Sequence, residues 1–141
     1  MKVKELILHC SATPEGVNYT VDRIDKWHKA KGYRKIGYHY YITLDGQIHK
    51  GRKDYETGAH CKNHNSIALG ICYCGGMDKS MKKPKDTRTP QQKEAMYELC
   101  YNLMQKYILT LDDIHCHNEF DNKACPSFSI TDFRKEFSEW I

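Results

Sequence analysis

The sequence has no long apolar run, no internal repeat and no tract of low complexity. Its longest largely apolar stretch, residues 67–77, is shorter than the roughly 20 residues that a membrane-spanning helix requires, so we expect no membrane span. The amino-terminal segment starts with charged residues but holds only a short apolar run and no small-residue cleavage site, so we expect no signal peptide. Synthesis in the cytoplasm is expected, with lysis or delivery as the route to any other compartment.

Close Cys-x-x-Cys pairs, the usual mark of a structural zinc site, are also missing, since Cys72 and Cys74 are separated by a single residue. The chain nevertheless has seven cysteines, an odd number. A disulfide framework favours an even number, a secretion signal and a smaller domain. We therefore expect reduced thiols, most of them buried as packing residues, with one or more in a special role.

The length suits one domain with a sizeable core, and we expect residues 1–141 to form a single domain and a monomer. The hydrophobic share of 40% and the charged share of 28% are those of an ordinary globular protein. A formal charge of +4 would help the protein to stay near an anionic polymer, either cell wall or nucleic acid, without identifying which. The lysines of residues 78–85 fit a solvated loop better than a nucleic-acid site, so no nucleic-acid partner is required.

The first half of the chain carries the patterns of a strand, a helix and a hairpin. Residues 3–10 form a short, largely apolar run that is typical of a buried strand. Thr20 precedes apolar residues at helical spacing that end at Gly32, which predicts a capped helix. Residues 38–50 contain an Asp-Gly pair between two strand-like runs, one of the strongest hairpin signals.

The second half carries a further strand and two helices. Residues 66–73 have the pattern of a buried strand, and residues 78–89 that of an exposed polar loop. Thr89 is followed by proline and, at the third position, by glutamine, which predicts the start of a long helix. Residues 129–141 predict a last helix. Elements in this order predict an α/β domain with a central mixed sheet flanked by helices.

Histidines and cysteines that suit a metal gather in three short segments, residues 9–13, 115–119 and 123–126. Zinc prefers nitrogen and sulfur ligands, and a hydrolytic zinc site uses three of them and keeps its fourth position for water. His115 and His117 lie two apart, so on a strand they would point the same way, and either or both could face a metal. The alternative is a chance cluster, with histidines satisfied locally and cysteines packed in the core.

Lys123 and Cys125 give a second indication of hydrolytic chemistry. If this segment is extended, both side chains project from one face, which places an ammonium group beside a metal held by the thiolate. A cation there could stabilise the oxyanion that forms when water attacks an amide carbonyl. The alternative is a solvated surface lysine.

Several motifs occur in the order found in one enzyme family. They are HCSAT at residues 9–13, WHKAKG at 27–32, GYHYYITLDGQI at 37–48, GAHCKNHNSIALGICYCGG at 58–76, TPQQ at 89–92 and HNEFDNKACPSF at 117–128. Through these motifs, which cover most of its length, the chain resembles the type-2 N-acetylmuramoyl-L-alanine amidases. That family includes phage lysozyme-type amidases and animal peptidoglycan recognition proteins. The resemblance implies their mixed-sheet fold and hydrolysis of the amide bond between N-acetylmuramic acid and L-alanine in peptidoglycan.

The resemblance also implies which residues form the site. One zinc ion would be held by His9, His117 and Cys125, because the family's second histidine ligand stands eight residues before the cysteine. Tyr38 matches the family's catalytic tyrosine, and Lys123 matches its catalytic lysine. The retained cysteine, tyrosine and lysine favour catalysis over muropeptide binding alone, since recognition proteins that only bind commonly lack the cysteine.

The resemblance implies a substrate groove as well. His60 matches a position that lines it, and Asn65 is expected nearby. Asn118 departs from phage relatives, which can carry a histidine there, and we expect little effect. The match is strongest with the phage-type branch, which predicts a phage or prophage endolysin that acts on the cell wall after release. The alternatives are a non-catalytic muropeptide-binding module and a cysteine hydrolase that pairs Cys125 with His117.

Overall fold

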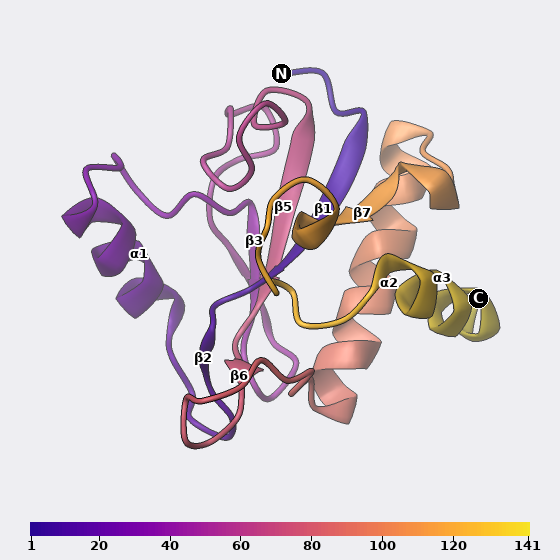
Figure 1. The fold of residues 1–141 in the computed structure, drawn as a ribbon. Helices are drawn as coiled ribbons and strands as arrows, with labels where there is room; N and C mark the ends of the chain where they lie inside the picture. The colour runs from indigo at the N-terminus through magenta and orange to yellow at the C-terminus, as the bar shows by residue number, and fades with distance from the viewer.

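The central sheet of the computed structural model, which describes residues 1–141, contains five strands in the order β4-β3-β5-β1-β7 (Figure 1). Neighbouring strands are parallel except for β3 and β4. The expected mixed sheet is therefore confirmed. Its strands are β1 (Glu5–Cys10), β3 (Tyr40–Ile42), β4 (Ile48–Lys50), β5 (Ala68–Tyr73) and β7 (Ile114–Cys116).

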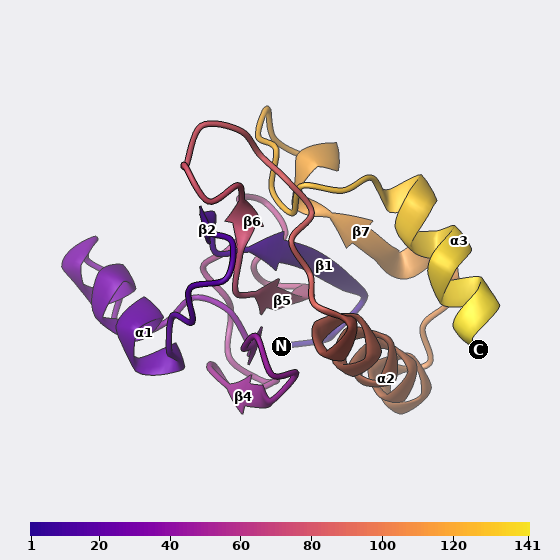
Figure 2. The same ribbon diagram turned by 90° about the horizontal axis from the view of Figure 1, so that it is seen from below.

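Three helices flank this sheet, and each begins at a side-chain cap. Figures 1 and 2 show α1 (Val21–Ala30) on one side, and α2 (Pro90–Tyr107) with α3 (Ile130–Trp140) on the other. The hydroxyls of Thr20 and Ser129 accept hydrogen bonds from main-chain N–H groups in the first turns of α1 and α3. At the start of α2, Thr89 and Gln92 cap each other's backbone, which confirms the predicted capping box.

One face of the sheet carries the main apolar core. Because side chains alternate along a strand, Leu6 and Leu8 of β1 point to this face together with Leu69 and Ile71 of β5, and all four are fully buried. The helices α2 and α3 cover them with a stripe of apolar side chains. From α2 and α3 the buried members include Ala95, Met96, Leu99, Leu103, Phe133 and Phe137, as the helical spacing predicts.

On the opposite face of the sheet, β5 contributes smaller side chains. Ala68, Gly70 and Cys72 of β5 lie here, and His9 of β1 points to this side. The apolar clusters on this face are small, and one of them joins Ile24 of α1 to the sheet. The space next to β5 is filled by loops that carry histidines, and this face holds the candidate site.

The predicted hairpin turn is confirmed. Thr43 N–H donates to the carbonyl of Gln47 over 3.1 Å, and Gly46 adopts a φ of +83°, which favours glycine. A second, two-stranded sheet of β2 (Thr13–Pro14) and β6 (Gly76–Met77) has no counterpart among the predicted elements. Strands of two residues are too short to show an alternating pattern.

The polar loop between β6 and α2 departs from its prediction at its carboxyl end. Thr87 and Arg88 are buried rather than exposed. The Thr87 hydroxyl accepts from Gly76 N–H over 2.8 Å, and the Arg88 guanidinium pairs with Asp86 and with Glu136 of α3. These partners offset the cost of removing the guanidinium from water. None of the helices has the length and apolar character needed to cross a membrane.

Candidate metal centre

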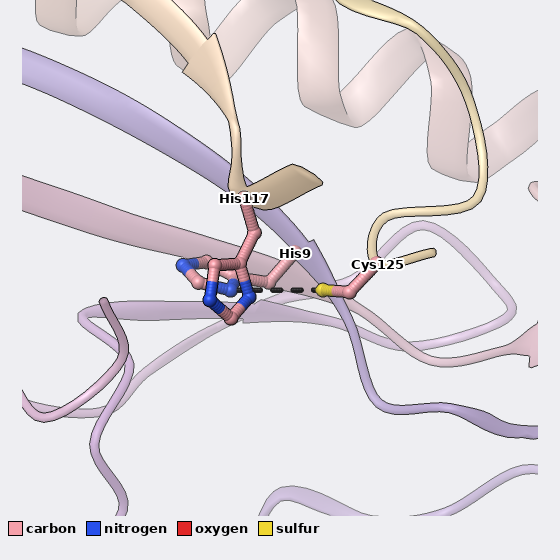
Figure 3. Close-up of side chains that lie close together, drawn as sticks. All are labelled: His9, His117 and Cys125. Carbon is pink, nitrogen blue, oxygen red and sulfur yellow. Dashed lines mark hydrogen bonds between the residues drawn. The ribbon is translucent and has the colours of Figure 1, made fainter. Parts of the chain in front are cut away.

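Two histidines and a cysteine from opposite ends of the chain meet at one edge of the sheet (Figure 3). His9 lies near the carboxyl end of β1, and His117 begins the short 3-10 helix η2 (His117–Glu119) directly after β7. Because β1 and β7 are parallel neighbours, these ends lie at the same edge. Cys125 lies in the loop that leads to α3, and the possible ligand atoms of the three residues all lie within 4.8 Å of one another.

The spacing and the chemistry of these donors fit a zinc ion. Zn–N bonds of about 2.0 Å and Zn–S bonds of about 2.3 Å in a tetrahedron separate nitrogen from sulfur by about 3.5 Å. The distance from His9 Nδ1 to Cys125 Sγ is 3.7 Å. Two imidazoles and one thiol form a set of three, which leaves a fourth position for water. The cluster thus has the donor set of an open, hydrolytic metal site.

His115 does not join this cluster. Its ring nitrogens face the carboxylates of Glu5 and Glu119 at 3.7 and 3.3 Å, and its ring packs against Phe120 with the ring centroids 5.2 Å apart. The strand ends at Cys116 and the chain then enters η2, so the strand alternation does not continue to His117. Of the two histidines left open by the spacing, only His117 lies with His9 and Cys125.

Burial keeps the imidazoles of the cluster neutral. It lowers the pKa of His9 well below the usual value, and the neighbouring His60 and His117 lower it further. Burial also lowers the pKa of His117, and it lowers that of His60 to about 3. Neutral imidazoles have a free lone pair, which a metal ligand needs.

The thiol of Cys125 is not activated as a free nucleophile. A hydrogen bond shared with Cys10, together with burial, raises the pKa of Cys125. Nucleophilic cysteines instead have a lowered pKa, commonly beside an imidazolium, whereas the pKa of the neighbouring His117 is lowered. All seven cysteines are free, as expected, and six of them are buried.

A cavity of about 470 Å³ opens beside the cluster, and all of the predicted catalytic and groove residues line it together with His117. Tyr38, just before β3, lies with its ring centroid 5.1 Å from that of His9, and burial raises the pKa of its phenol well above the usual value. The predicted catalytic and groove residues that line the cavity are Tyr38, His60, Asn65 and Lys123.

The segment that carries Lys123 and Cys125 is turned, not extended, which corrects the expected geometry. Lys123 N–H donates to the carbonyl of Asp121 over 2.9 Å, and Ser127 N–H donates to that of Ala124 over 2.6 Å. The Lys123 side chain is 61% exposed and its ammonium group lies 3.8 Å from the Asp121 carboxylate. It borders the cavity from the solvent side and does not pack beside Cys125 along a strand.

His60 and Asn65 belong to one loop before β5. The Asn65 side-chain oxygen accepts from the main-chain N–H groups of His60 and Cys61 over 2.7 and 2.9 Å. That oxygen therefore shapes the loop. The His60 ring lies edge-on to His9, with the ring centroids 4.9 Å apart.

His28 of α1 lines the cavity, although no site role was predicted for it. Its Nδ1 accepts from Gly37 N–H over 2.8 Å, which anchors the segment just before Tyr38. Together with Tyr38 and Lys31 it lines both the cavity beside the cluster and a second one of about 310 Å³ that also includes Trp27. The WHKAKG motif contains Trp27, His28 and Lys31, so this motif is the signal in the sequence that points to the cavity lining.

An α/β domain with a His/His/Cys cluster at a sheet edge, next to a polar cavity, has the architecture of a metal-dependent hydrolase. Comparison with known proteins narrows this class. The family model for N-acetylmuramoyl-L-alanine amidase matches residues 1–128. The chain therefore belongs to the N-acetylmuramoyl-L-alanine amidase family, and its activity is that of a peptidoglycan amidase.

Individual relatives agree with this assignment. The chain is 36% identical over 125 residues to the endolysin of Escherichia phage T7, covering 89% of this chain and 81% of that protein. It is 34% identical over 129 residues to the endolysin of Klebsiella phage KP32, covering 92% and 83%. Among solved structures, N-acetylmuramoyl-L-alanine amidase LysC from Clostridium intestinale URNW superposes with a TM-score of 0.81 at 29% identity, covering 97% of this chain and 86% of that one. Both the predicted family and the predicted fold are confirmed.

Proposed function

We propose that this amidase is zinc-dependent, that His9, His117 and Cys125 hold the ion, and that Tyr38 and Lys123 carry catalytic roles beside it. The observation that carries the proposal is the meeting of the three ligand atoms within 4.8 Å at a cavity that Tyr38 and Lys123 also line. The endolysin relatives support a phage or prophage setting, in which the enzyme acts on the cell wall after release.

Each residue has a separate task in this proposal. A zinc ion, when bound, supplies a Lewis acid and an activated water to the scissile amide. The neutral rings of His9 and His117 offer lone pairs, and Cys125 gives up its proton as it becomes a ligand. Tyr38 helps to position the attacking water by a hydrogen bond from its phenol, which the raised pKa keeps protonated. Lys123 stabilises the oxyanion of the tetrahedral intermediate.

The cavity suits a ligand with carboxylates. Three lysines, Lys31, Lys62 and Lys123, line it, and Asp121 is the only acidic residue that does so. Stem peptides of peptidoglycan carry carboxylates, so this lining favours them over a cationic ligand. The exposed ammonium group of Lys123 can leave Asp121 for the substrate, since surface ion pairs of this kind contribute little energy.

The test is digestion of purified peptidoglycan followed by mass analysis of the products. We expect stem peptides that begin with L-alanine, their loss on zinc chelation, and their return when zinc is added back. The Cys125→Ser variant is expected to release none. Reducing sugar without such peptides would contradict the proposal.

The same assay separates the alternatives. A muropeptide-binding module would bind the walls and release no peptide. A cysteine hydrolase would keep its activity after chelation and lose it with a thiol-alkylating reagent. The raised pKa of Cys125 and the retained Tyr38 and Lys123 favour the zinc amidase over both.

A further inference from the structure

The side chain of His60 is engaged at both of its ring nitrogens inside the protein. Its Nε2 lies 3.1 Å from the carbonyl oxygen of Ala68, and its Nδ1 lies 2.9 Å from Nε2 of His9. Neither nitrogen is free to bind a ligand in the cavity, although the ring borders that cavity. A substrate-binding role alone therefore leaves these two contacts unexplained.

The carbonyl at the far end determines the direction of this hydrogen-bond chain. A carbonyl oxygen only accepts, so Nε2 of His60 must carry the proton and donate it to Ala68. A neutral imidazole has one N–H group, so Nδ1 of His60 is an acceptor. His9 must then donate from Nε2, which leaves the lone pair of His9 on Nδ1. That Nδ1 is the atom that faces Cys125 Sγ at 3.7 Å.

We propose that His60 is a positioning residue: it holds the ring of His9 and keeps its proton on Nε2, so that Nδ1 is presented to the metal. The inference rests on the proposed function, because it takes His9 to be a ligand. Histidine ligands of metals commonly donate their second N–H to a partner, which fixes both the tautomer and the orientation of the ring. Here that partner is a second imidazole anchored on the main chain of β5.

The space for the His60 ring is built into the sheet. A Cβ atom on Gly70, in the middle of β5, would lie 2.6 Å from Cγ of His60, and one on Gly58 would lie 2.5 Å from its Cδ2. Neither glycine has a positive φ, so the backbone conformation does not require glycine at either position. The close approach of the His60 ring explains why both positions lack a side chain. Glycine inside a strand lowers stability, which marks this pocket as a specific requirement.

A third histidine closes the pocket from the β3 side. His39 is fully buried, and its ring lies edge-on to that of His60 with the centroids 5.7 Å apart. Its Nδ1 accepts from Gly70 N–H over 3.0 Å, and its Nε2 donates to the carbonyl of Glu56 over 2.8 Å. The main-chain N–H of His60 donates to the side-chain oxygen of Asn65, which fixes the backbone from which the ring projects.

Two substitutions of His60 test the acceptor Nδ1 and the donor Nε2 separately. His60→Asn keeps an acceptor near the position of Nδ1, whereas His60→Gln keeps a donor near that of Nε2 and loses the acceptor for His9. Zinc affinity is measured by competition with a chromogenic chelator. We expect the Kd for zinc to rise about 10- to 100-fold in His60→Gln and in His60→Ala, and His60→Asn to restore most of the affinity. The control His49→Asn, on the hairpin, should bind zinc like the parent.

The results distinguish this inference from the proposed function. If Cys125→Ser loses zinc while His60→Ala binds it as tightly as the parent, the role of His60 is wrong and the metal site stands. If Cys125→Ser binds zinc like the parent, the metal site itself is wrong.

A measurement on the unsubstituted enzyme guards against variants that fail to fold. In a two-bond ¹H–¹⁵N correlation spectrum of the zinc-loaded protein labelled with ¹⁵N-histidine, we expect His60 and His9 each to carry their proton on Nε2. A proton on Nδ1 of His60 would overturn the inference.

Discussion

The two faces of the central sheet are formed by the same strands but differ in the size and polarity of their side chains. On the face covered by α2 and α3, β1 contributes Leu6 and Leu8, and the core there includes 18 buried residues. On the opposite face, β5 contributes Gly70, and β1 contributes His9. Removal of apolar surface from water contributes roughly 25 cal/mol per Å², so the α2/α3 face supplies most of the stability.

The small side chains of the second face make room for imidazoles. His9, His39, His60 and His117 lie on or beside it. His39 and His60 form hydrogen bonds to main-chain groups, His60 also to His9, and the rings of His9 and His117 lie side by side. Substitutions on the α2/α3 face should therefore alter the free energy of unfolding, and those on the histidine-rich face should alter metal binding and turnover. The predictions below test this division.

The largest expected effect is on turnover. Lys123→Ala should lower kcat about 10²- to 10³-fold, as loss of an oxyanion-stabilising group does, and Tyr38→Phe about 10²- to 10⁴-fold. Both variants should retain zinc and the parent's free energy of unfolding, since neither residue is a proposed ligand. Peptide release from purified walls and chelator competition give the two readouts. If either variant keeps full activity, its catalytic role is wrong.

A large loss of stability is expected from the opposite face. Phe137 is fully buried between α3, α2 and the sheet, so Phe137→Ala should lower the free energy of unfolding by about 3–5 kcal/mol. Urea unfolding measures the loss. At low temperature the folded fraction should still bind zinc with parental affinity, because Phe137 does not touch the metal cluster. A large drop in zinc affinity of the folded variant would contradict the division between the faces.

A single added methyl group on the histidine-rich face tests whether a change there alters zinc binding as well as stability. Gly70→Ala adds a Cβ atom that would lie 2.6 Å from the His60 ring, so the ring must move. We expect a loss of about 1–3 kcal/mol in stability together with weaker zinc binding. Chelator competition on the folded variant separates the two effects. Unchanged zinc affinity would show that the histidine-rich face tolerates repacking without loss of the site.

Acid sensitivity should arise away from the metal cluster. Burial alone would raise the pKa of Asp54, but hydrogen bonds from Lys50, Tyr107 and Tyr40 outweigh it and hold that pKa well below the usual value. A lowered pKa in the folded state contributes stability that is present above about pH 4 and is lost as the pH falls below it. Asp54→Asn should therefore lower stability at pH 7 by about 1–2 kcal/mol and reduce the loss between pH 5 and pH 3. Urea unfolding at these pH values checks both expectations, and an unchanged acid dependence would contradict them.

Features that depend on neighbours in the sequence were predicted well. Thr20, Thr89 and Ser129 begin helices because a cap needs only its own first turn, and the hairpin turn at Gly46 needs only a few residues. The small sheet of β2 and β6 was not predicted, because it depends on two segments that meet only after folding. Buried Arg88 belongs to the same class, since its partner Glu136 lies 48 positions away.

The candidate site follows the same rule. The histidines and the cysteine were visible as residue types, and the family resemblance selected among them. The turned segment around Lys123 and the double engagement of His60 were not predictable, because each depends on contacts with other parts of the chain. Spacing alone could not separate His115 from His117, since the strand that would align them ends between them.

The pair His115 and His117 gives the smallest expected effect and a direct check of that point. His115→Asn should leave the Kd for zinc unchanged within about two-fold and lower stability by at most about 1 kcal/mol, because the contacts of His115 with the carboxylates of Glu5 and Glu119 are partly exposed. His117→Asn, two positions along, should lose zinc. Chelator competition on both variants decides between the two histidines, because loss of zinc in His115→Asn and its retention in His117→Asn would mean that His115, and not His117, is the metal ligand.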